Sequence, residues 1–281
     1  MDENNAGDGK RGYLNRDFAL FHLKDMKNIS FEYHYHDFNK IVVFVSGNVT
    51  YLIEGTAYRL KPWDVLFVSS CEVHRAIIDP TVPYERIVIW VNPGFLERHS
   101  EECSLSDCFG PNTGKNGNLL RLDPVFRNEV ALLLSKLEEA YRSDGFGSVL
   151  LKNALLLQLL VELTRKRLGG NGSDCSDIVI DCTIQKLLDY INRNIGGDLS
   201  IDSLASKFYM NRYHLMHKFK QQTGYTVHSY ILQKRLIKAD TLLRGGMTAA
   251  QASEQCGFKD YSSFSRAYGK MFGASPKKRR K

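Results

Sequence analysis

The hydrophobic residues follow one period in the first third of this chain and another in the remainder. Between residues 31 and 91, short runs rich in Val, Ile, Tyr and Phe are separated by turn residues such as Gly and Pro. The strands that these runs predict are 40–45, 49–53, 57–60, 65–68, 73–78 and 84–91, in a small sandwich or barrel. After Pro93 the apolar residues recur about every 3.6 positions, which predicts helices.

Two apolar helices are expected after the strands. Asp123 and Pro124 suit the N-cap and the first position of the first helix. Its expected apolar face consists of Leu132, Leu133, Leu137 and Tyr141. A second helix is predicted from about 148 to 167. We interpret the pair as a helical hairpin that packs on the β domain or on a second subunit, and its apolar surplus favours a dimer.

The last hundred residues contain one helical unit twice. Ser200 and Asn211 are suited to cap two consecutive helices, and Thr248 and Asp260 hold the same places about 50 residues later. Two capped helices joined by a tight turn indicate a helix-turn-helix motif. The further helices predicted in this part of the chain are 183–194 and 227–243.

Charge and composition divide the chain further. Residues 183–281 hold 18 Lys and Arg against 6 Asp and Glu, whereas residues 1–182 hold 20 against 25. Such a local positive balance is typical of a protein that binds the phosphate backbone of nucleic acids. The expected segments are a β domain at 1–95 whose first 17 residues form a mobile arm, a hairpin at 96–168, a flexible linker at 169–182 and a tandem helix-turn-helix domain at 183–281.

The second helix of each unit is expected to enter the major groove of DNA with its first turns. The side chains expected to contact DNA there are Arg212, Tyr213, Met216, His217, Tyr261, Ser262, Ser263 and Arg266. Apolar residues such as Leu215 and Phe264 would face the other way, into the core. For any single one of these polar residues, plain solvent exposure is the competing interpretation, and the duplicated frame is the stronger signal.

The second unit also carries a signature. Residues 257–266 read Gly-Phe-Lys-Asp-Tyr-Ser-Ser-Phe-Ser-Arg, and residues 272–276 read Phe-Gly-Ala-Ser-Pro. This pattern resembles the DNA-binding domain of the AraC/XylS family of bacterial transcription regulators over about 100 residues. The departures are Ala249, Ala252 and Ser253, where the family usually has Ile, Ile and Ala. Smaller side chains there predict a looser helix and a weaker second unit.

Histidines are the candidate chemistry of the β domain. His34 and His36 are two residues apart on an expected strand and point to one face, where His74 could join them. The arrangement resembles the cupin barrel that many AraC-type regulators carry as a sensor. Metal-binding cupins also place a Glu four residues beyond the second His, whereas this chain has Lys40. A cation at that position disfavours a divalent metal ion.

Three interpretations of the histidines remain open: core packing, a metal site, and hydrogen bonding to a small polar ligand. The third is preferred, and the residues assigned to the ligand are His34, His36, Lys40, His74 and Trp90. No metal and no cofactor are predicted. The resemblance implies that the ligand is often a sugar. Trp90, Trp63 and Tyr51 could supply stacking faces for it, or belong to the core.

The sequence therefore predicts an α+β multidomain protein with an N-terminal cupin-like β-barrel, a helical hairpin and an all-α tandem helix-turn-helix domain. We expect a dimeric, sequence-specific transcription regulator whose partners are double-stranded DNA, a small-molecule effector and RNA polymerase. The family resemblance favours activation. The start of the chain lacks the apolar segment of a secretory signal, so a cytoplasmic location is expected. The alternative is a metal-dependent cupin enzyme with a helical appendage, although no enzymatic activity is predicted.

Overall fold

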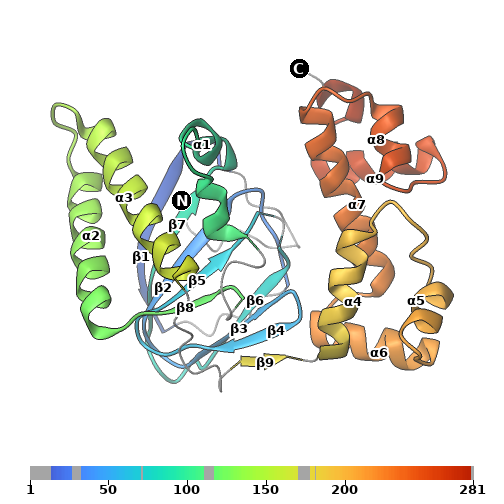
Figure 1. Cartoon of the computed structure of the whole chain (residues 1–281), viewed down its shortest axis with the longest axis horizontal. Coiled ribbons are helices and arrows are strands. Elements are labelled where there is room, and N and C mark those ends of the chain that lie inside the picture. The colour runs from blue at the N-terminus through green and yellow to red at the C-terminus, as the bar shows by residue number, and fades with distance from the viewer. Residues whose placement is uncertain are drawn as a thin grey trace. The chain divides into compact units, whose positions relative to one another are not determined.

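The computed structural model describes residues 14–26, 33–70, 72–110, 117–169, 178–180 and 182–279. The chain forms two compact units, Met1–Val179 and Ile180–Lys281, which are described separately below (Figure 1). The first thirteen residues, most of the expected linker and the last two residues of the basic tail lie outside the described ranges.

The first unit is built on two β-sheets. The five-stranded sheet has the spatial order β1 (Phe18–Asp25), β7 (Tyr84–Val91), β2 (Asn39–Ser46), β5 (Asp64–Val68) and β8 (Leu119–Arg121). The four-stranded sheet has the order β6 (His74–Ile78), β3 (Val49–Ile53), β4 (Thr56–Arg59) and β9 (Ile178–Ile180). The expected all-β domain is therefore confirmed as a sandwich of two sheets.

Alternation along β2 shows how the layers are arranged. Val42 and Phe44 point toward the four-stranded sheet, where they pack with residues such as Tyr51. Ile41 and Val43 belong to a second core on the opposite face of the same strand. Because successive side chains of a strand point to opposite faces, β2 is buried on both sides and reads as an uninterrupted apolar run.

A helical hairpin covers the outer face of the five-stranded sheet (Figure 1). Its helices are α2 (Pro124–Arg142) and α3 (Ser148–Leu168), preceded by α1 (Pro93–Arg98) and the 3₁₀ helix η1 (Leu105–Phe109). Asp123 caps α2 by accepting hydrogen bonds from two backbone amides, as predicted. The hairpin thus packs on the β domain, which was one of the two expected arrangements.

The predicted apolar face of α2 is wrong at one position. Leu133 and Leu137 are buried, whereas Leu132 is 57% exposed. Residues 133 and 137 are four apart and share a face, while residue 132 is rotated by about 100° from its neighbour. Leu134, on the other side of Leu133, is buried, so the buried face of α2 is centred away from Leu132.

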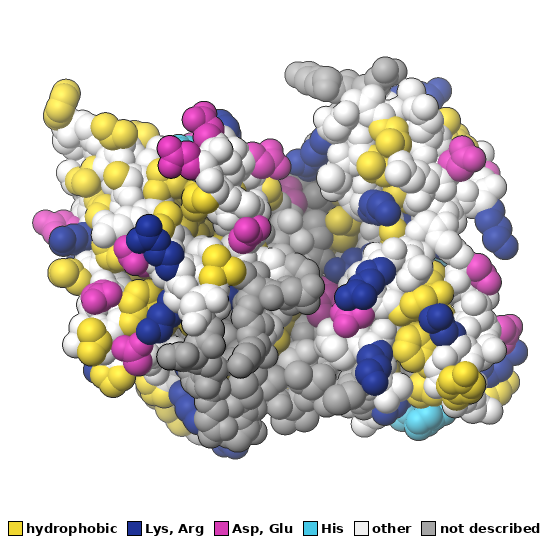
Figure 2. Space-filling view, viewed as in Figure 1, with side chains coloured by type: hydrophobic (Ala, Val, Ile, Leu, Met, Phe, Trp, Pro, Cys, Tyr) yellow, Lys and Arg dark blue, Asp and Glu magenta, His cyan; other side chains and the backbone are white. Residues whose placement is uncertain are grey.

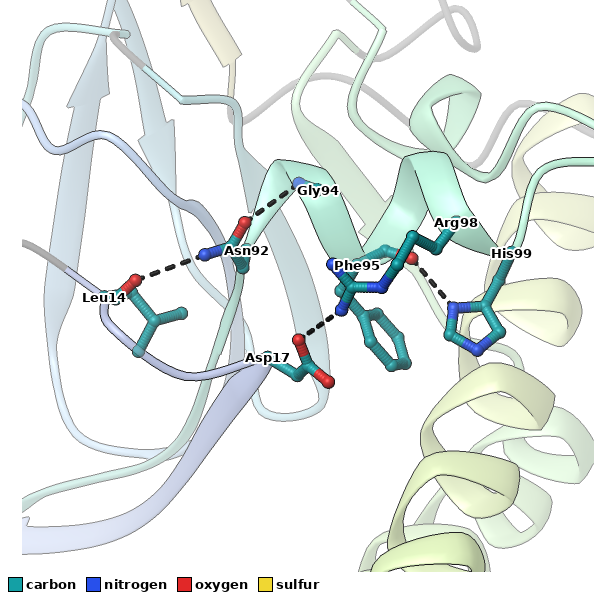
Figure 3. Close-up of polar contacts among 7 residues, drawn as sticks. All are labelled: Leu14, Asp17, Asn92, Gly94, Phe95, Arg98 and His99. Atoms are coloured by element: carbon teal, nitrogen blue, oxygen red, sulfur yellow. Dashed lines mark hydrogen bonds and ion pairs between the residues drawn. The ribbon is translucent and has the colours of Figure 1, made fainter. Parts of the chain in front are cut away.

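The segment before β1 is fastened to the domain, which corrects part of the expected mobile arm (Figure 3). The Asn92 side chain caps α1 by accepting a hydrogen bond from Gly94 N at 2.9 Å, and donates one to Leu14 O at 3.2 Å. Arg98 forms an ion pair with Asp17. Residues 14–17 are therefore held against the start of α1.

The strands β1 and β8 were not predicted. β1 pairs along its whole length with β7, from Phe18 opposite Val91 to Asp25 opposite Tyr84. β8 is three residues long and pairs with β5. Both extend a sheet whose other strands are far away in the sequence, so local pattern alone carries little signal for them.

In the second unit, the described residues from Cys182 onward form no strand, only helices. They are α4 (Cys182–Arg193), α5 (Ile201–Lys207), α6 (Arg212–Thr223), α7 (Val227–Arg244), α8 (Ala249–Gln255), α9 (Tyr261–Phe272) and the 3₁₀ helix η2 (Pro276–Arg279). All four predicted N-caps are confirmed, since Ser200, Asn211, Thr248 and Asp260 each accept hydrogen bonds from amides of the helix that follows. Among the described helices, none has the length and apolar character needed to cross a membrane.

The central helix α7 joins both helix-turn-helix units. Toward the first helix-turn-helix unit, the ring of Tyr230 meets Phe219 of α6 edge-on, with ring centroids 5.5 Å apart. Toward the second helix-turn-helix unit, Leu236 and Leu243 share a buried core with Phe264 of α9. Each unit therefore buries its apolar side against the same helix.

Candidate functional site

The three predicted histidines of the β domain come together inside the sandwich. His34 and His74 exchange backbone hydrogen bonds of 3.0 Å in both directions. The ring centroid of His74 lies 4.3 Å from that of His34 and 4.8 Å from that of His36. We call His34, His36 and His74 the histidine cluster.

Backbone carbonyls fix the tautomers of two of these rings. Nδ1 of His36 lies 2.6 Å from Phe38 O, and Nδ1 of His74 lies 3.0 Å from Glu72 O. A carbonyl oxygen only accepts, so each Nδ1 carries the hydrogen and each Nε2 presents a lone pair. Within the described part of the chain, both Nε2 atoms are buried and have no hydrogen-bond partner.

The surroundings keep these imidazoles neutral. Burial lowers the pKa of His36 well below its ordinary value of 6.5, and the charge of Lys40 lowers it further. The pKa of His74 is lowered in the same way by burial, then by the neighbouring His34 and His36 and by Lys40. Neutral rings with a protonated Nδ1 accept hydrogen bonds at Nε2, which suits hydroxyl donors.

Trp90 and Lys40 complete the predicted ligand site. They lie opposite each other in the antiparallel pair of β2 and β7. The ring of Trp90 stacks on Phe38 at 4.5 Å, and Phe38 stacks on His36 at 4.0 Å. Trp90 Nε1 is buried without a hydrogen-bond partner among the described residues. The structure thus brings all five assigned residues into one region, where the buried atoms without a partner among the described residues are two acceptors and one donor.

Two aromatic candidates lie elsewhere, and one was missed. Trp63 packs with the core on the opposite face of the five-stranded sheet. Tyr51 is buried in the sandwich core, with its hydroxyl 3.3 Å from that of Tyr84. Phe38 links His36 to Trp90, and Leu14 packs in the same small core. The two-residue spacing of His34, His36, Phe38 and Lys40 was the signal that could have identified Phe38.

The described residues contain no group of three His, Cys, Asp or Glu side chains arranged to hold a metal ion. The cationic Lys40 faces both histidines, as its effect on their pKa values shows. The charge of Lys40 therefore favours the neutral form of both imidazoles.

The candidate DNA-contacting residues lie at the starts of α6 and α9. Those with exposed side chains are Arg212, Tyr213, His217, Tyr261, Ser262, Ser263 and Arg266, and Met216 is partly buried. Tyr213 is 72% exposed. Leu215 and Phe264 are completely buried, so the helices turn their apolar sides inward as predicted. His214 is also exposed and was not in the predicted set, although it adjoins Tyr213 on the same turn.

The two turns have the same backbone geometry. Tyr209 and Gly257 both have positive φ, at 52° and 76°. In each turn the next amide closes back on the helix, from Met210 N to Ala205 O at 2.9 Å and from Phe258 N to Ser253 O at 3.1 Å. These are the bonds of a helix C-terminal motif with a left-handed residue, and they confirm that the units are structural repeats.

Lys and Arg side chains are spread over the visible face of the helical unit (Figure 2). Arg212 forms an exposed ion pair with Asp202 at 3.4 Å, and Arg266 Nε donates to Ser262 O at 3.4 Å. Both contacts are exposed and long, so they hold the two guanidinium groups only weakly.

Comparison with known proteins finds a match for each part of the chain. The sequence model described as "AraC-like ligand binding domain" matches residues 20–160, which is half of the chain, and the model described as "Helix-turn-helix domain" matches residues 204–281. The chain belongs to the AraC family. It is accordingly a DNA-binding transcription regulator with a ligand-binding domain.

The similar relatives of this AraC-family regulator include two named activators. It is 26% identical to the HTH-type transcriptional activator RhaR of Mannheimia succiniciproducens over 88% of this chain and 86% of that protein. It is 24% identical to the activator RhaS of Escherichia fergusonii over 88% and 87%. Among solved structures, ToxT from Vibrio cholerae matches with 15% identity and a TM-score of 0.37, over 93% of this chain and 96% of that one.

Proposed function

We propose that this AraC-family regulator activates transcription in response to a small polyhydroxylated molecule held by His36, His74 and Trp90. The three buried polar atoms at these residues, which have no partner among the described residues, carry the proposal. A buried polar atom without a hydrogen bond costs about 1–3 kcal/mol. Core packing alone leaves that cost uncompensated, whereas a bound ligand supplies the missing bonds.

The chemistry of the atoms indicates the ligand class. Two Nε2 lone pairs accept from hydroxyl groups, and Trp90 Nε1 donates to a hydroxyl or ring oxygen. The partly exposed indole ring of Trp90 suits the apolar side of a sugar ring, and Phe38, stacked between His36 and Trp90, holds the indole in place. His34 and Lys40 complete the proposed site. A sugar meets all of these requirements, and a binding role without catalysis is sufficient for them.

The eight residues predicted at the starts of α6 and α9 are proposed to read two successive major-groove segments. Their exposure and the matching N-caps support this role. Arg212 holds the same place in the first unit as Tyr261 in the second, and Arg266 the same place as His217 in the first. The two arginines are the strongest candidates for contacts with guanine. The names of the activators RhaR and RhaS support activation as the output. RNA polymerase as a partner and a cytoplasmic location are part of the same proposal.

We further propose that α3 joins two copies of the chain. Leu150, Ala154, Leu157 and Val161 recur at helical spacing on this helix. Leu150 is 74% exposed and Ala154 is exposed, whereas Leu157 and Val161 are partly buried against the core of the domain. Apolar side chains are visible among charged ones over the hairpin (Figure 2). A second copy of the same stripe is the partner that this self-complementary surface favours. The proposed roles of the segments are ligand sensing for 1–95, dimerisation for 96–168, linkage for 169–182 and DNA binding for 183–281.

The test of the ligand site uses the full-length protein and a panel of neutral sugars and sugar acids, with binding measured by calorimetry. We expect at least one member to bind, and His74→Ala or Trp90→Phe to weaken that binding about tenfold or more, the loss of one buried hydrogen bond. The matched control is His22→Ala, which removes an exposed histidine. Equal binding by all variants, or binding by no sugar, would contradict this ligand class.

The test of the DNA site is selection of preferred sequences from a random duplex library. Arg266→Ala is expected to cost about 1–3 kcal/mol and to relax the preference at one or two base pairs. Lys270→Ala changes an exposed charge in the last turn of the same helix and is the control. Unchanged specificity in Arg266→Ala would remove this residue from the proposed set.

A further inference from the structure

Three elements of the helical unit meet at Arg235, which lies in the middle of α7. Its Nε donates to Ile195 O at 2.9 Å, and one of its terminal nitrogens donates to Gly197 O at 2.8 Å. Both carbonyls belong to the segment that follows α4. A single planar guanidinium therefore joins α7 to the end of α4 through two directional bonds.

The third element is the turn of the second helix-turn-helix unit. A Cβ atom added at Gly257 would lie 2.7 Å from Gly196 O and 2.9 Å from a terminal nitrogen of Arg235. A Cβ atom added at Gly196 would lie 2.5 Å from Gln255 O. The backbone of this turn thus rests directly on the segment after α4, beside the Arg235 head group.

The other side of α4 packs on the first helix-turn-helix unit. The ring of Tyr190 meets Phe208, at the end of α5, with centroids 5.9 Å apart. The Lys207 ammonium lies 4.6 Å from the centre of the Tyr190 ring. The end of α4 consequently connects the two helix-turn-helix units, as α7 does. Arg235 joins the end of α4 to α7 by hydrogen bonds.

This geometry has a mechanical consequence. The contacts of α7 with α6 and α9 are largely apolar, and apolar packing is non-directional. The hydrogen bonds of Arg235 are directional and weaken steeply when bent. Together with the hydrogen bond from Tyr268 of α9 to Asp240 of α7, they oppose rotation of one helix-turn-helix unit about the axis of α7.

We propose that Arg235 is a positioning residue that fixes the distance and angle between α6 and α9, and so selects the spacing of the two DNA segments that the protein reads. This inference rests on the proposed role of α6 and α9 as the helices that enter the major groove. One extra base pair moves a segment by about 3.4 Å along the duplex and rotates it by about 34°. A rigid pair of helices cannot follow such a change, whereas a loosened pair can.

The experiment uses the full-length protein and the bipartite DNA site selected by the wild type from a random library. Duplexes are prepared with the two halves at the selected spacing, one base pair closer, and one or two base pairs farther apart. Further duplexes carry one intact and one scrambled half. Affinities are measured by fluorescence anisotropy at near-physiological salt for wild type, Arg235→Met, Arg235→Lys and the control Lys238→Met.

We expect wild type and Lys238→Met to prefer one spacing by tenfold or more, because both halves are engaged together only there. Arg235→Met should bind that duplex about tenfold more weakly and discriminate among the spacings by less than about threefold. Arg235→Lys keeps the charge but not the forked geometry, so it should lie between the two. Binding to duplexes with one intact half should be unchanged in every variant.

A spacing preference in Arg235→Met as sharp as that of wild type would overturn the inference. So would an equal loss on all duplexes, including those with one intact half, because that pattern reports general destabilisation. Arg235→Lys serves as the milder variant if circular dichroism shows that Arg235→Met is unfolded. Failure of the wild type to select any bipartite site would instead contradict the proposed function of α6 and α9.

Discussion

The hydroxyl of Tyr268 in α9 donates a hydrogen bond to the carboxylate of Asp240 in α7, and both side chains are buried. Arg244 binds the same carboxylate at 2.9 Å from one turn further along α7. The charged acceptor makes this bond stronger than one between neutral groups. One of the two proposed DNA-reading helices is therefore fixed to the central helix by a polar contact as well as by apolar packing.

Tyr268→Phe removes this hydroxyl and little else. We expect the free energy of unfolding of the helical unit to fall by about 1.5–3 kcal/mol, since a buried carboxylate loses a partner. Urea unfolding followed by circular dichroism gives the value. Tyr261→Phe, at an exposed position of the same helix, should change stability by less than about 0.5 kcal/mol. Equal stability of the two variants would show that the contact contributes nothing.

The histidine cluster predicts that the β unit loses stability in mild acid. His36 and His74 have folded-state pKa values below 6.5, so the unfolded chain binds protons first as the pH falls. Stability is therefore full above about pH 6.5 and declines below it, by up to about 1.4 kcal/mol per pH unit for each histidine. Unfolding in urea at pH 5.5, 6.5 and 7.5 measures the slope.

His36→Gln should reduce that slope, because one buried titrating group is gone. His228→Gln, which replaces an exposed histidine of α7, should leave it unchanged. A slope that does not respond to His36→Gln would place the titration elsewhere.

The contacts of Arg167 predict that the stability of the β unit depends strongly on the last turn of α3. Its buried guanidinium donates to Cys108 O and, at 2.7 Å, to Gly117 O, and lies 4.4 Å from the centre of the Phe67 ring. Arg167→Met should lower the free energy of unfolding by about 2–3 kcal/mol, because both carbonyls lose a charged donor. Arg165→Met removes an exposed arginine from the same turn and should be nearly neutral. Comparable losses in the two variants would contradict the role given to these bonds.

Replacing either of two glycines of the second helix-turn-helix unit by Ala should change the free energy of unfolding, but in opposite directions. Gly257→Ala places a Cβ atom on a residue with φ of 76° and against a backbone carbonyl, so it should cost about 2–4 kcal/mol. Gly269 lies inside α9, with open space around its Cα, and Gly269→Ala should stabilise by about 0.5–1 kcal/mol. Thermal unfolding distinguishes the two signs. A stable Gly257→Ala would mean that the turn does not rest on the segment after α4.

Local rules predicted the helical unit well and the β unit less completely. The caps at Ser200, Asn211, Thr248 and Asp260 are side-chain contacts within one turn, so the sequence contains all of the information that they need. β1 and β8 exist because of partners elsewhere in the chain, and Leu132 shows that an apolar residue can point away from the core.

The features of the candidate sites also differ in how far the sequence could predict them. His34 and His36 were found by their two-residue spacing, which extended backbone converts into a shared face, and Lys40 by its place where metal-binding cupins have a Glu. The direction of the lone pairs on His36 and His74 depends on carbonyls at Phe38 and Glu72, and no sequence pattern contains it. Arg235 escaped notice because its two acceptors are backbone atoms about 40 residues away along the chain, which leave no mark on residue type.

The contact between Gly196 and Gly257 gives the two helix-turn-helix copies different freedom to change. In the first copy the turn residue Tyr209 projects almost entirely into solvent, so many side chains would be tolerated there. In the second copy the equivalent residue has no room even for a methyl group. The two copies of an apparently symmetrical duplication are thus no longer interchangeable, and exchanging their turns would fit in one direction only.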